Sequence, residues 1–517
     1  MPAITLEHPF LRKHQAAITG VLSCFDRVIF RGHLPLSYPR GLEGFLGQQG
    51  ILLKHLKDYA PKIAERVKEH VKRLVEAAGA PFRHLPKRER MEDAARQLAH
   101  QRGVTEGIVC GFSQLETCAT FRLQFGDGRP RLKKDYRRCM VLYVFVLHAV
   151  LGLIHVKLET WFPLTMQVYV NGHEYLARKM DAAGLNYEAV DNAFVQLADA
   201  TAAQRLADGF VKLKWPQLLG ALARQFNPLL SAELKGRDYY WVTDQAEYAT
   251  DVLFGDAAAL QALYPRLVEH ATLCLGSEDV LRFLGRKLHP CFVGEVHTHA
   301  GRRVEGTRVK HVCRSNVLKL YDKVGRVLRV ETVLNRPRDF RVRRWRSLPG
   351  GGRELAWQAL PKGVAWLWRY AEIGRTANGR YLEALVAVDS WQQARAAWDQ
   401  VTRPARLGSR RQRALQPLNA AEQALFLAVL RGGECVRGVS HEAVSARLYG
   451  RAPRDASARR RRSARVTRQL QLLRAHGLLA KIPRTRRYRV TAKGEALMSA
   501  ALYVRRKYLP KELQEER

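Results

Sequence analysis

The sequence predicts an α+β fold: a mixed or antiparallel sheet body with inserted helices, followed by a helical segment and a small C-terminal domain. Strand-like apolar segments gather in 139–172 and 291–346 and do not alternate regularly with helices, which argues against a βαβ architecture. Helical patterns dominate after the breaker Pro-Gly-Gly-Gly at 349–352. Because 517 residues exceed the size of a single core, we expect about two to four domains.

The first region, 1–138, combines one strand with helices and forms part of the main body. The strand is SCFDRVIFRG, residues 23–32, and helical patterns follow at 41–59, 61–79 and 88–102. Pro61 in the first turn and Gly79 at the end mark the limits of the second helix.

The main body, 139–348, contains most of the predicted strands. The apolar run MVLYVFVLHAVLGLIHV, 140–156, is short for a membrane span and rich in β-branched and aromatic residues. It predicts two buried strands joined near Gly152. Further strands are expected at HVKLETWF and MQVYVNG, and 239–254 is expected to be extended in part.

A hairpin closes this body at VLKLYDKVGRVLRVETVL, 317–334. We expect Leu320 to pair with Leu328 across a loop of Lys323, Val324 and Gly325, which places Glu331 diagonal to Lys319. One face of the hairpin would then be apolar and the other would be charged.

The C-terminal region divides into a helical segment at 353–402, a basic linker at 403–418 and a separate domain at 419–510. In this domain Asn419 and Ser440 are expected to cap the first two helices, and Gly477 ends the third. Two short strands around a basic turn and a last helix follow.

This element order resembles the winged helix-turn-helix family of bacterial regulators and replication proteins. The resemblance implies that the third helix enters a DNA groove and that the wing follows the phosphate backbone. The alternative is a solvated basic face on a protein-binding domain. The arginines expected to contact nucleic acid are Arg459, Arg460, Arg461, Arg462, Arg465 and Arg468 on the helix, and Arg484, Arg486, Arg487 and Arg489 on the wing.

The overall charge points to the same kind of partner. Lys and Arg number 87 against 48 Asp and Glu, so the formal net charge is +39. Such an excess favours a polyanion, with nucleic acid ahead of an anionic membrane, which we do not expect to be a partner. DNA is favoured over RNA, although aromatic residues interleaved with basic ones in FRLQF and KDYRR would also suit RNA.

Three carboxylates within apolar strands are candidate metal ligands. Asp26, Glu159 and Glu331 each interrupt a strand pattern, where an unpaired charge is costly. If they converge they would hold Mg²⁺ or Mn²⁺, as metal-dependent nucleases require. The alternative is a set of structural ion pairs. Glu247 and Asp251 are four apart and are expected to share a helical face.

His297 and His299 form a second, weaker metal candidate. They are similar to the His-x-His pair of HUH endonucleases, although Thr298 replaces the bulky hydrophobic residue of that motif. A chance match is the alternative, because the chain contains 17 histidines.

Two further resemblances concern function. FDRVIFRG, ETWFPLTMQVYVNGHEYLARKMD, YYWVTDQAEYATDVLF and KLYDKVGRVLRVETVLNRPRDF, with other stretches along nearly the whole chain, resemble an uncharacterised bacterial family that occurs in several copies per genome. This implies a mobile element. The hairpin itself is similar to one in replication initiators of rolling-circle plasmids and filamentous phages. The matching residues are Lys319, Tyr321, Asp322, Lys323, Arg329 and Glu331.

The initiator resemblance implies nicking of one DNA strand by a tyrosine with a bound divalent metal. The segment GTRVKH, 306–311, which would carry the nucleophile in the plasmid family, has no tyrosine. Tyr239 and Tyr240 are alternative nucleophiles, and packed aromatic residues are the competing interpretation.

We therefore expect a nucleic-acid-binding protein of a mobile element that cuts a strand with a metal, as a replication initiator or transposase does. Catalytic candidates are Glu331, Asp26, Glu159, Tyr321 and Lys319, and Lys323 and Arg329 are added to the nucleic-acid contacts. The alternatives are a non-enzymatic winged-helix regulator, which would need no cofactor, and an RNA-binding component of a ribonucleoprotein. The start of the chain has no apolar signal core and the eight cysteines are scattered, so a cytoplasmic or nucleoid-associated location is expected.

Overall fold

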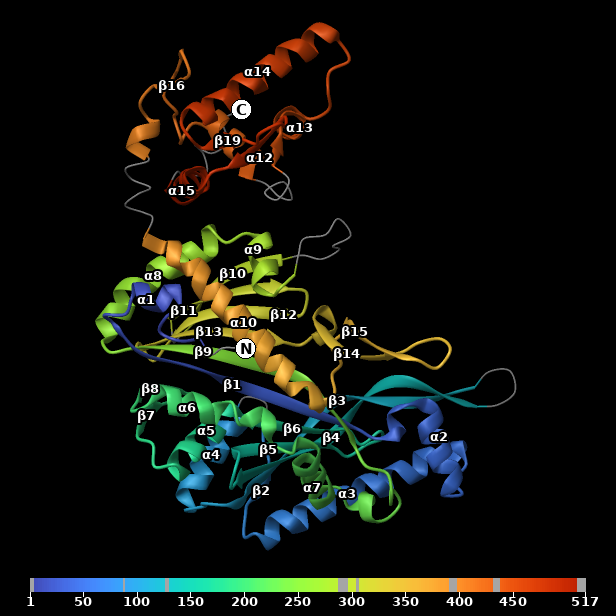
Figure 1. Cartoon of the computed structure of the whole chain (residues 1–517). Helices are drawn as coiled ribbons and strands as arrows, with labels where there is room; N and C mark the ends of the chain where they lie inside the picture. The colour runs from blue at the N-terminus through green and yellow to red at the C-terminus, as the bar shows by residue number, and fades with distance from the viewer. Residues whose placement is uncertain are drawn as a thin grey trace. The chain divides into compact units, whose positions relative to one another are not determined.

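The computed structural model describes residues 4–86, 89–125, 130–286, 296–303, 306–389, 398–430 and 438–508. The chain divides into two compact units (Figure 1). The first comprises residues 1–261 and 301–381, and the second comprises residues 262–300 and 382–517. Each contains helices and strands, so the α+β prediction is confirmed.

One large mixed sheet organises the first unit. Its strand order is β10-β11-β12-β13-β9-β1-β6-β5-β4-β3-β2. The neighbouring pairs from β11 to β3 are antiparallel, and β2 is parallel to β3. The strands are β1 Ile18–His33, β2 Phe82–His84, β3 Gly107–Gln124, β4 Arg131–His148, β5 Gly152–Glu159, β6 Met166–Asn171, β9 Tyr240–Phe254, β10 Val296–Arg303, β11 Gly306–Cys313, β12 Asn316–Lys323 and β13 Val327–Leu334.

The apolar run at 140–156 forms parts of β4 and β5, as predicted, with Gly152 at positive φ where β5 begins. Its residues pair across the two strands, for example Val144 with Val156. None of the helices in the described part of the chain combines the length and the apolar character needed to cross a membrane.

Four helices lie in the N-terminal part of the chain, and the last three of them contact β3 or β4 of the sheet. They are α1 Pro9–Lys13, α2 Pro39–Gln48, α3 Leu56–Ala77 and α4 Met91–Gln101. The predicted start of α3 at Pro61 is wrong, because the helix begins at Leu56 and contains Pro61. Leu56 and Ala60 are buried and extend the stripe of Ile63, Val67 and Val71 by one turn, which explains the earlier start.

The strand β1 pairs with β9 along its whole length but with β6 only from Arg27 onward. The region beside its first half holds α5 Gly172–Ala182, the hairpin β7 Tyr187–Val190 with β8 Ala193–Leu197, and α6 Ala200–Ala207. The Gln204 side-chain amide there accepts a hydrogen bond from Ser23 N and donates one to Ser23 O, both at 2.8 Å. This amide pairs with one residue of the β1 edge that β6 does not cover. The helix α7 Trp215–Phe226 follows α6.

The hairpin β12–β13 differs from its predicted register by two residues. Leu320 pairs with Val330, and Lys319 lies directly opposite Glu331. The loop is Val324–Arg326, with positive φ at both Val324 and Gly325. Because the shift is even, the predicted apolar and charged faces are unchanged.

The prediction of helices throughout 353–402 is wrong for its first residues. Residues Arg353–Ala359 form β15, which pairs with β14 Arg341–Ser347 in a separate ribbon. The sequence RELAWQA alternates with period two, and Gly350 and Gly351 at positive φ close the ribbon. The helix α10 Leu367–Ala384 then follows as expected.

The second unit holds the C-terminal elements and its own core, which includes Phe426, Val444, Val466 and Leu497. Its helices are α8 Ala257–Leu273 at the boundary, α9 Ser277–Phe283, α12 Ala420–Leu430, α13 His441–Tyr449, α14 Ala456–Ala475 and α15 Ala492–Tyr508. Its strands are β16 Ala405–Leu407, β17 Arg410–Gln412, β18 Val439–Ser440, β19 Leu479–Lys481 and β20 Arg487–Val490.

The predicted details of this unit are partly confirmed. Asn419 accepts a hydrogen bond from Ala421 N and Ser440 from Ala443 N, so both caps are present. Gly477 lies at positive φ after α14. The residues 403–418, predicted as a linker, include the hairpin β16–β17, and Leu415 is buried in the core of this unit.

Candidate functional site

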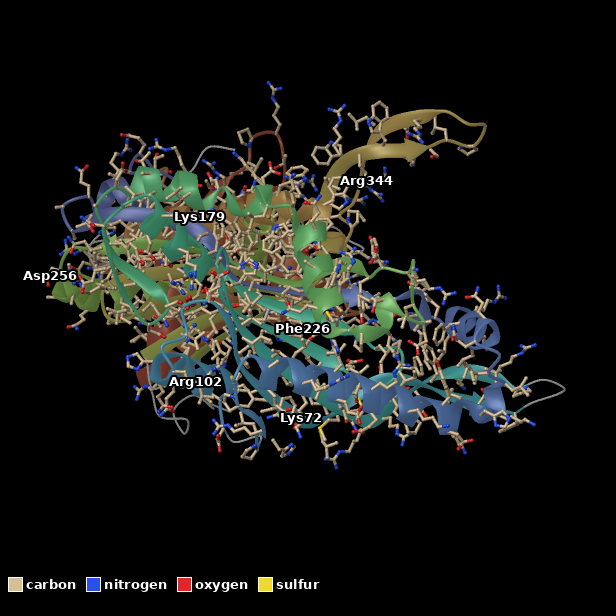
Figure 2. All side chains as sticks on the ribbon, turned by 90° about the horizontal axis from the view of Figure 1, so that it is seen from below. Lys72, Arg102, Lys179, Phe226, Asp256 and Arg344 are labelled. Carbon is tan, nitrogen blue, oxygen red and sulfur yellow. The ribbon has the colours of Figure 1, made fainter. Side chains whose placement is uncertain are left out.

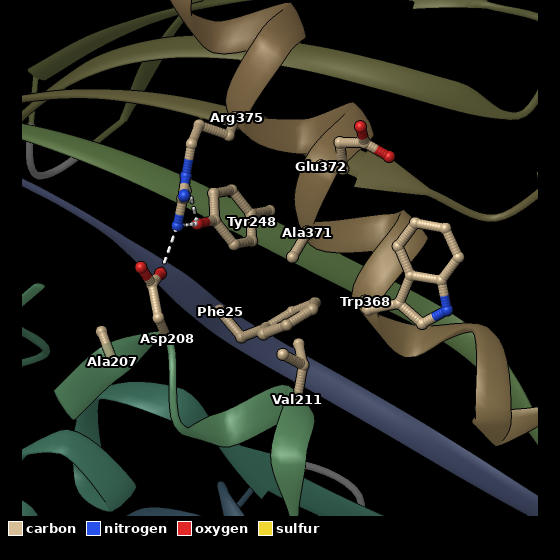
Figure 3. Close-up of a pocket in the computed structure, with 9 residues that line it drawn as sticks. All are labelled: Phe25, Ala207, Asp208, Val211, Tyr248, Trp368, Ala371, Glu372 and Arg375. Atoms are coloured by element: carbon tan, nitrogen blue, oxygen red, sulfur yellow. Dashed lines mark hydrogen bonds and ion pairs between the residues drawn. The ribbon is translucent and has the colours of Figure 1, made fainter. Parts of the chain in front are cut away.

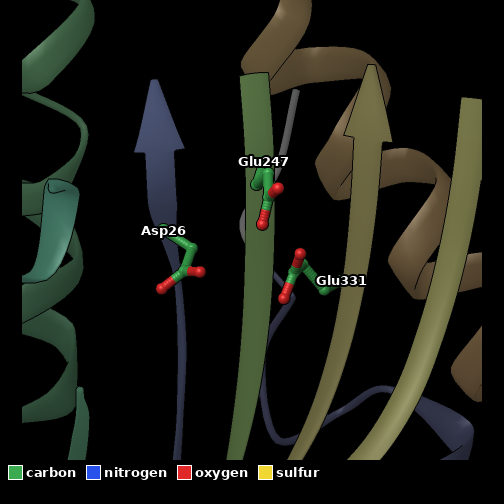
Figure 4. Close-up of side chains that lie close together, drawn as sticks. All are labelled: Asp26, Glu247 and Glu331. Atoms are coloured by element: carbon green, nitrogen blue, oxygen red, sulfur yellow. The ribbon is translucent and has the colours of Figure 1, made fainter. Parts of the chain in front are cut away.

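Three carboxylates from neighbouring strands converge in the sheet of the first unit. Asp26 comes from β1, Glu247 from β9 and Glu331 from β13, and one oxygen of each lies within 4.8 Å of the others (Figure 4). All three residues are buried. The sequence named Asp26 and Glu331 as candidate metal ligands without showing whether they meet, and the structure brings these two together.

Local strand geometry aims these side chains at one point. The pairing of β1 with β9 shifts between Phe25 and Arg27, so Asp26 sits at a β-bulge that redirects its side chain. Glu247 and Glu331 follow the ordinary alternation of β9 and β13, which places both on the same face of the sheet.

Lys319 bridges two of the carboxylates. Its Nζ donates to Glu331 Oε1 at 2.5 Å and to Glu247 Oε2 at 3.2 Å. The Tyr321 hydroxyl donates to the other oxygen of Glu331, also at 2.5 Å. Both residues come from β12 and face β13, which explains the charged face predicted for this hairpin.

Arg329 forms ion pairs with Asp26, the third converging carboxylate, and with the neighbouring Asp251. Its Nε and Nη2 donate to the two oxygens of Asp251 at 2.6 and 2.7 Å, and its Nη1 donates to Asp26 at 3.3 Å. Its side chain is only 1% exposed. The bidentate geometry makes this a rigid structural clamp beside the three converging carboxylates.

The start of α5 supports Asp26 from the opposite side. Asn171 caps this helix by accepting from His173 N at 2.8 Å, and His173 Nδ1 then lies 3.2 Å from Asp26 Oδ1. A Cβ on Gly172 would lie 2.0 Å from Phe25 O, so only glycine permits this approach. The Asn192 amide, from the β7–β8 turn, also donates to Asp26 at 2.5 Å.

The carboxylates differ in their ease of ionisation. Burial raises the pKa of Asp26, but the contacts with His173 and Arg329 outweigh it and hold that pKa well below its ordinary value. Burial, reinforced by the negative charges of Asp26 and Glu247, raises the pKa of Glu331 to about 7 against the attraction of Lys319. Glu331 is therefore the group of this set that exchanges a proton near neutral pH.

The neighbouring Tyr321 and Lys319 remain protonated at that pH. Burial and the charge of Glu331 raise the pKa of Tyr321 well above its ordinary value. Burial lowers the pKa of Lys319, but the negative charges of Glu331 and Glu247 raise it by more. The pKa therefore lies above its ordinary value and the ammonium is retained.

The three carboxylates fit a hard divalent cation. Mg²⁺ and Mn²⁺ prefer carboxylate oxygens, and a set of three such ligands leaves coordination positions for water or phosphate. Lys319 now supplies the positive charge that such an ion would supply. Deprotonation of Glu331 and movement of Lys319 would accompany binding.

Glu159, the third predicted ligand, does not belong to this cluster. It lies on β5, and β6 separates that strand from β1. Its carboxylate is largely buried, and burial raises its pKa. Glu247 takes the place that Glu159 was predicted to fill. The expectation that Glu247 and Asp251 share a helical face is wrong, because both lie on strand β9.

The histidine pair and the alternative tyrosines lie elsewhere. His297 and His299 are exposed on β10, and neither belongs to a group of three or more close metal ligands within the described ranges. Tyr239 is buried, accepting from Asn227 and donating to Leu164 O, as a packed aromatic residue does. Tyr240 is 65% exposed.

Two predicted nucleic-acid contacts in the sheet, Lys323 and Arg329, form ion pairs in this structure. The guanidinium of Arg329 is buried in ion pairs and cannot reach a bound strand in this structure. Lys323 forms an ion pair with Asp191. The alternating sequence could not distinguish a charge facing the solvent from one covered by the β7–β8 hairpin.

The predicted arginines of the second unit are mostly exposed. On α14 the exposed residues are Arg459, Arg460, Arg461, Arg465 and Arg468, and around the turn from β19 to β20 they are Arg484, Arg486, Arg487 and Arg489. Arg462 is half-buried and donates to the carbonyls of Ser445 and Gly450, each at 2.6 Å. Arg462 therefore braces the end of α13.

A separate pocket of about 220 Å³ lies between β1, α6 and α10 (Figure 3). Phe25, Tyr248 and Trp368 supply aromatic walls. Arg375 forms an ion pair with Asp208 and donates to the Tyr248 hydroxyl at 3.1 Å through Nε. None of the three converging carboxylates lines this pocket.

Comparison of the chain with protein-family models, with curated proteins and with solved structures gives no match. The chemistry of the site therefore has to be inferred from its own residues.

Proposed function

We propose that this chain is a nucleic-acid-processing protein of a mobile genetic element, and that its sheet unit cuts a strand with a divalent metal. The observation that carries the proposal is the convergence of Asp26, Glu247 and Glu331 within 4.8 Å. Buried carboxylates at this spacing repel one another unless a cation neutralises them. The origin in a mobile element rests on the family resemblance alone.

In this proposal Asp26, Glu247 and Glu331 hold Mg²⁺ or Mn²⁺, which would polarise a phosphate and stabilise the charge that develops on it. Tyr321 is the candidate nucleophile, since its hydroxyl already donates to Glu331. Attack of the Tyr321 oxygen would form a bond to phosphorus and transfer the phenolic proton to Glu331. The bond from phosphorus to the sugar oxygen would break, and that oxygen would take a proton from solvent water to leave as a hydroxyl. Water is the alternative nucleophile.

We further propose that residues 419–510 form a winged helix-turn-helix domain that binds duplex DNA. Three helices, with β18, β20 and β19 in one small sheet, follow the order expected for that domain. The exposed arginines of α14 and of the β19–β20 turn would then contact phosphates.

The test is strand cleavage of labelled single-stranded DNA, duplex DNA and structured RNA with Mg²⁺, Mn²⁺ or EDTA. Glu247→Gln and Glu331→Gln should each lower cleavage at least 100-fold. Glu159→Gln changes a partly buried carboxylate of the same sheet that lies outside the cluster. It is the matched control and should retain activity. Tyr321→Phe separates the nucleophiles, because only tyrosine attack requires the hydroxyl.

A wild-type protein that binds nucleic acid but cuts none of these substrates with either metal would overturn the enzymatic proposal. The second candidate, a non-enzymatic winged-helix regulator, would then remain. It is favoured by one observation: Lys319 already neutralises Glu247 and Glu331.

A further inference from the structure

The ribbon β14–β15 carries exposed tryptophans on one face. Arg343 pairs with Trp357 and Trp345 pairs with Leu355, so strand alternation places all four side chains on the same side. Trp345 is 65% exposed and Trp357 is 61% exposed. Indole rings are costly to leave in water, and two on one face indicate a surface that binds something.

This face is not a missing part of the core. Phe340, Val342 and Leu360 are buried at the base of the ribbon and attach it to the body. From there the strands extend away from the rest of the sheet unit to the glycine-rich tip, as Figure 2 shows beyond the label of Arg344. The tryptophans thus lie on a supported arm. The Arg369 guanidinium lies over the Trp357 ring, 6.0 Å from its centroid, and both indoles remain more than half exposed.

The charge of the ribbon identifies the kind of partner. One acidic residue, Glu354, lies within 341–359, and it is paired with Arg346. The ribbon carries Arg341, Arg343, Arg344, Arg346 and Arg353. Arginine alternating with aromatic residues suits a polyanion that also presents flat rings, which describes a nucleic acid strand.

Unpaired nucleotides fit better than a duplex. Trp345 and Trp357 are diagonal neighbours across the ribbon, a relation that separates their Cα atoms by about 7–8 Å. Two rings at this separation can each receive the face of one base. In a duplex these faces are already covered by neighbouring base pairs.

We propose that the ribbon β14–β15 binds a single-stranded segment of nucleic acid, with Trp345 and Trp357 stacking on bases and nearby arginines contacting phosphates. The inference rests on the proposed function and specifies the substrate region that the sheet unit holds. The β3–β4 hairpin also carries two exposed aromatic residues, Phe125 at 76% directly after β3 and Tyr136 at 75% opposite Ala119. In Figures 1 and 2 both arms project to the same side of the unit.

The test measures binding in EDTA by fluorescence anisotropy, using labelled dT20, rU20 and a 20-base-pair duplex with the full-length chain. The double variant Trp345→Ala/Trp357→Ala should lose at least tenfold in affinity for the single strands, since it removes both aromatic surfaces on which bases would stack. Its affinity for the duplex should change less than twofold. The stronger of dT20 and rU20 identifies the natural strand as DNA or RNA.

Two matched variants keep the test specific to stacking. Trp345→Phe/Trp357→Phe retains aromatic faces and should keep most of the affinity, whereas Trp345→Leu/Trp357→Leu should behave as the alanine variant does. The proposal would be overturned if the alanine variant kept its affinity for single strands, or if the leucine variant did. It would also be overturned if the alanine variant lost as much affinity for the duplex as for single strands. Because EDTA excludes metal-dependent cleavage, failure of the metal centre does not affect this result.

Discussion

Lys319 and Arg329 each neutralise two carboxylates, but they differ in how readily another cation could replace them. Arg329 is fully buried and contacts Asp251 through two parallel hydrogen bonds. Lys319 is a flexible ammonium whose side chain is 14% exposed. At the scale of single residues, Lys319 is therefore the cation that a metal ion would displace.

Lys319→Met tests this exchange. Without the ammonium, Glu247 and Glu331 are buried without their main counter-charge, and the free energy of unfolding in EDTA should fall by roughly 2–4 kcal/mol. Mn²⁺ should restore more stability to the variant than to the wild type. Thermal melts with and without Mn²⁺ measure both effects, and equal Mn²⁺-induced shifts in the two proteins would contradict the assignment.

Glu331→Gln tests the raised pKa. In the folded chain Glu331 has a pKa of about 7, above its ordinary value of 4.5. The folded state therefore binds the proton more tightly than the unfolded state, and this stability is lost as pH rises from about 4.5 through 7. Glutamine cannot ionise, so the variant should gain up to about 3 kcal/mol relative to wild type between pH 5 and pH 8.

Denaturant unfolding at several pH values provides the measurement. Glu159→Gln is a useful comparison, because burial raises the pKa of Glu159 in the same direction but outside the cluster. If the free energies of unfolding of the wild type and of Glu331→Gln differ by a constant amount from pH 5 to pH 8, Glu331 is ionised throughout this range.

The sequence could identify two of the three converging carboxylates because a charge inside an apolar strand has few explanations. Asp26 and Glu331 carried this signal and converge, whereas Glu159 carried it and does not. Glu247 was missed as a ligand because positions four apart share a face in both a strand and a helix, so the spacing to Asp251 could not identify β9. Which strands become neighbours depends on contacts far apart in sequence.

At the scale of elements, local patterns predicted the type of structure better than its limits. The alternation in β4, β5, β12 and β13 was sufficient to identify strands. Alternation was not sufficient to determine the register of the β12–β13 hairpin. A loop of Val324–Arg326 and a loop shifted by one residue are both compatible with Gly325 at positive φ. Helix limits such as that of α3 depended on burial by the rest of the unit.

Two neighbouring arginines of α14 allow a paired experiment. Arg462 bonds to carbonyls at the end of α13, so Arg462→Ala should destabilise the second unit by about 2–3 kcal/mol. Arg460 is exposed, so Arg460→Ala should leave the melting temperature unchanged and weaken duplex binding. Thermal melts and anisotropy on both variants measure these effects. Equal destabilisation by the two substitutions would contradict the distinction.

At the scale of the whole molecule, the net charge of +39 predicts strong salt dependence of nucleic acid binding. Each phosphate contact contributes about 0.9 to the slope of log affinity against log salt concentration. The triple variant Arg459→Gln/Arg460→Gln/Arg461→Gln should lower the magnitude of the duplex slope by up to about 3. Binding that is insensitive to salt would contradict the electrostatic argument.

The order of strands in the large sheet could not be derived from the sequence. Composition and periodicity indicated an α+β chain, but nothing local specifies that β1 lies between β6 and β9. The pairing of β1 with β9 joins segments about 200 residues apart, and it is this pairing that places Asp26 beside Glu247.

That long-range pairing also has a consequence for synthesis on the ribosome. Residues Ile18–His33 leave the ribosome well before Tyr240–Phe254, and at about 5–20 residues per second the delay is on the order of 10 to 40 s. During this interval one edge of the nascent β1 has no partner and is open to aggregation. We therefore expect the yield of soluble chain to depend on translation rate and on chaperones that shield an early strand.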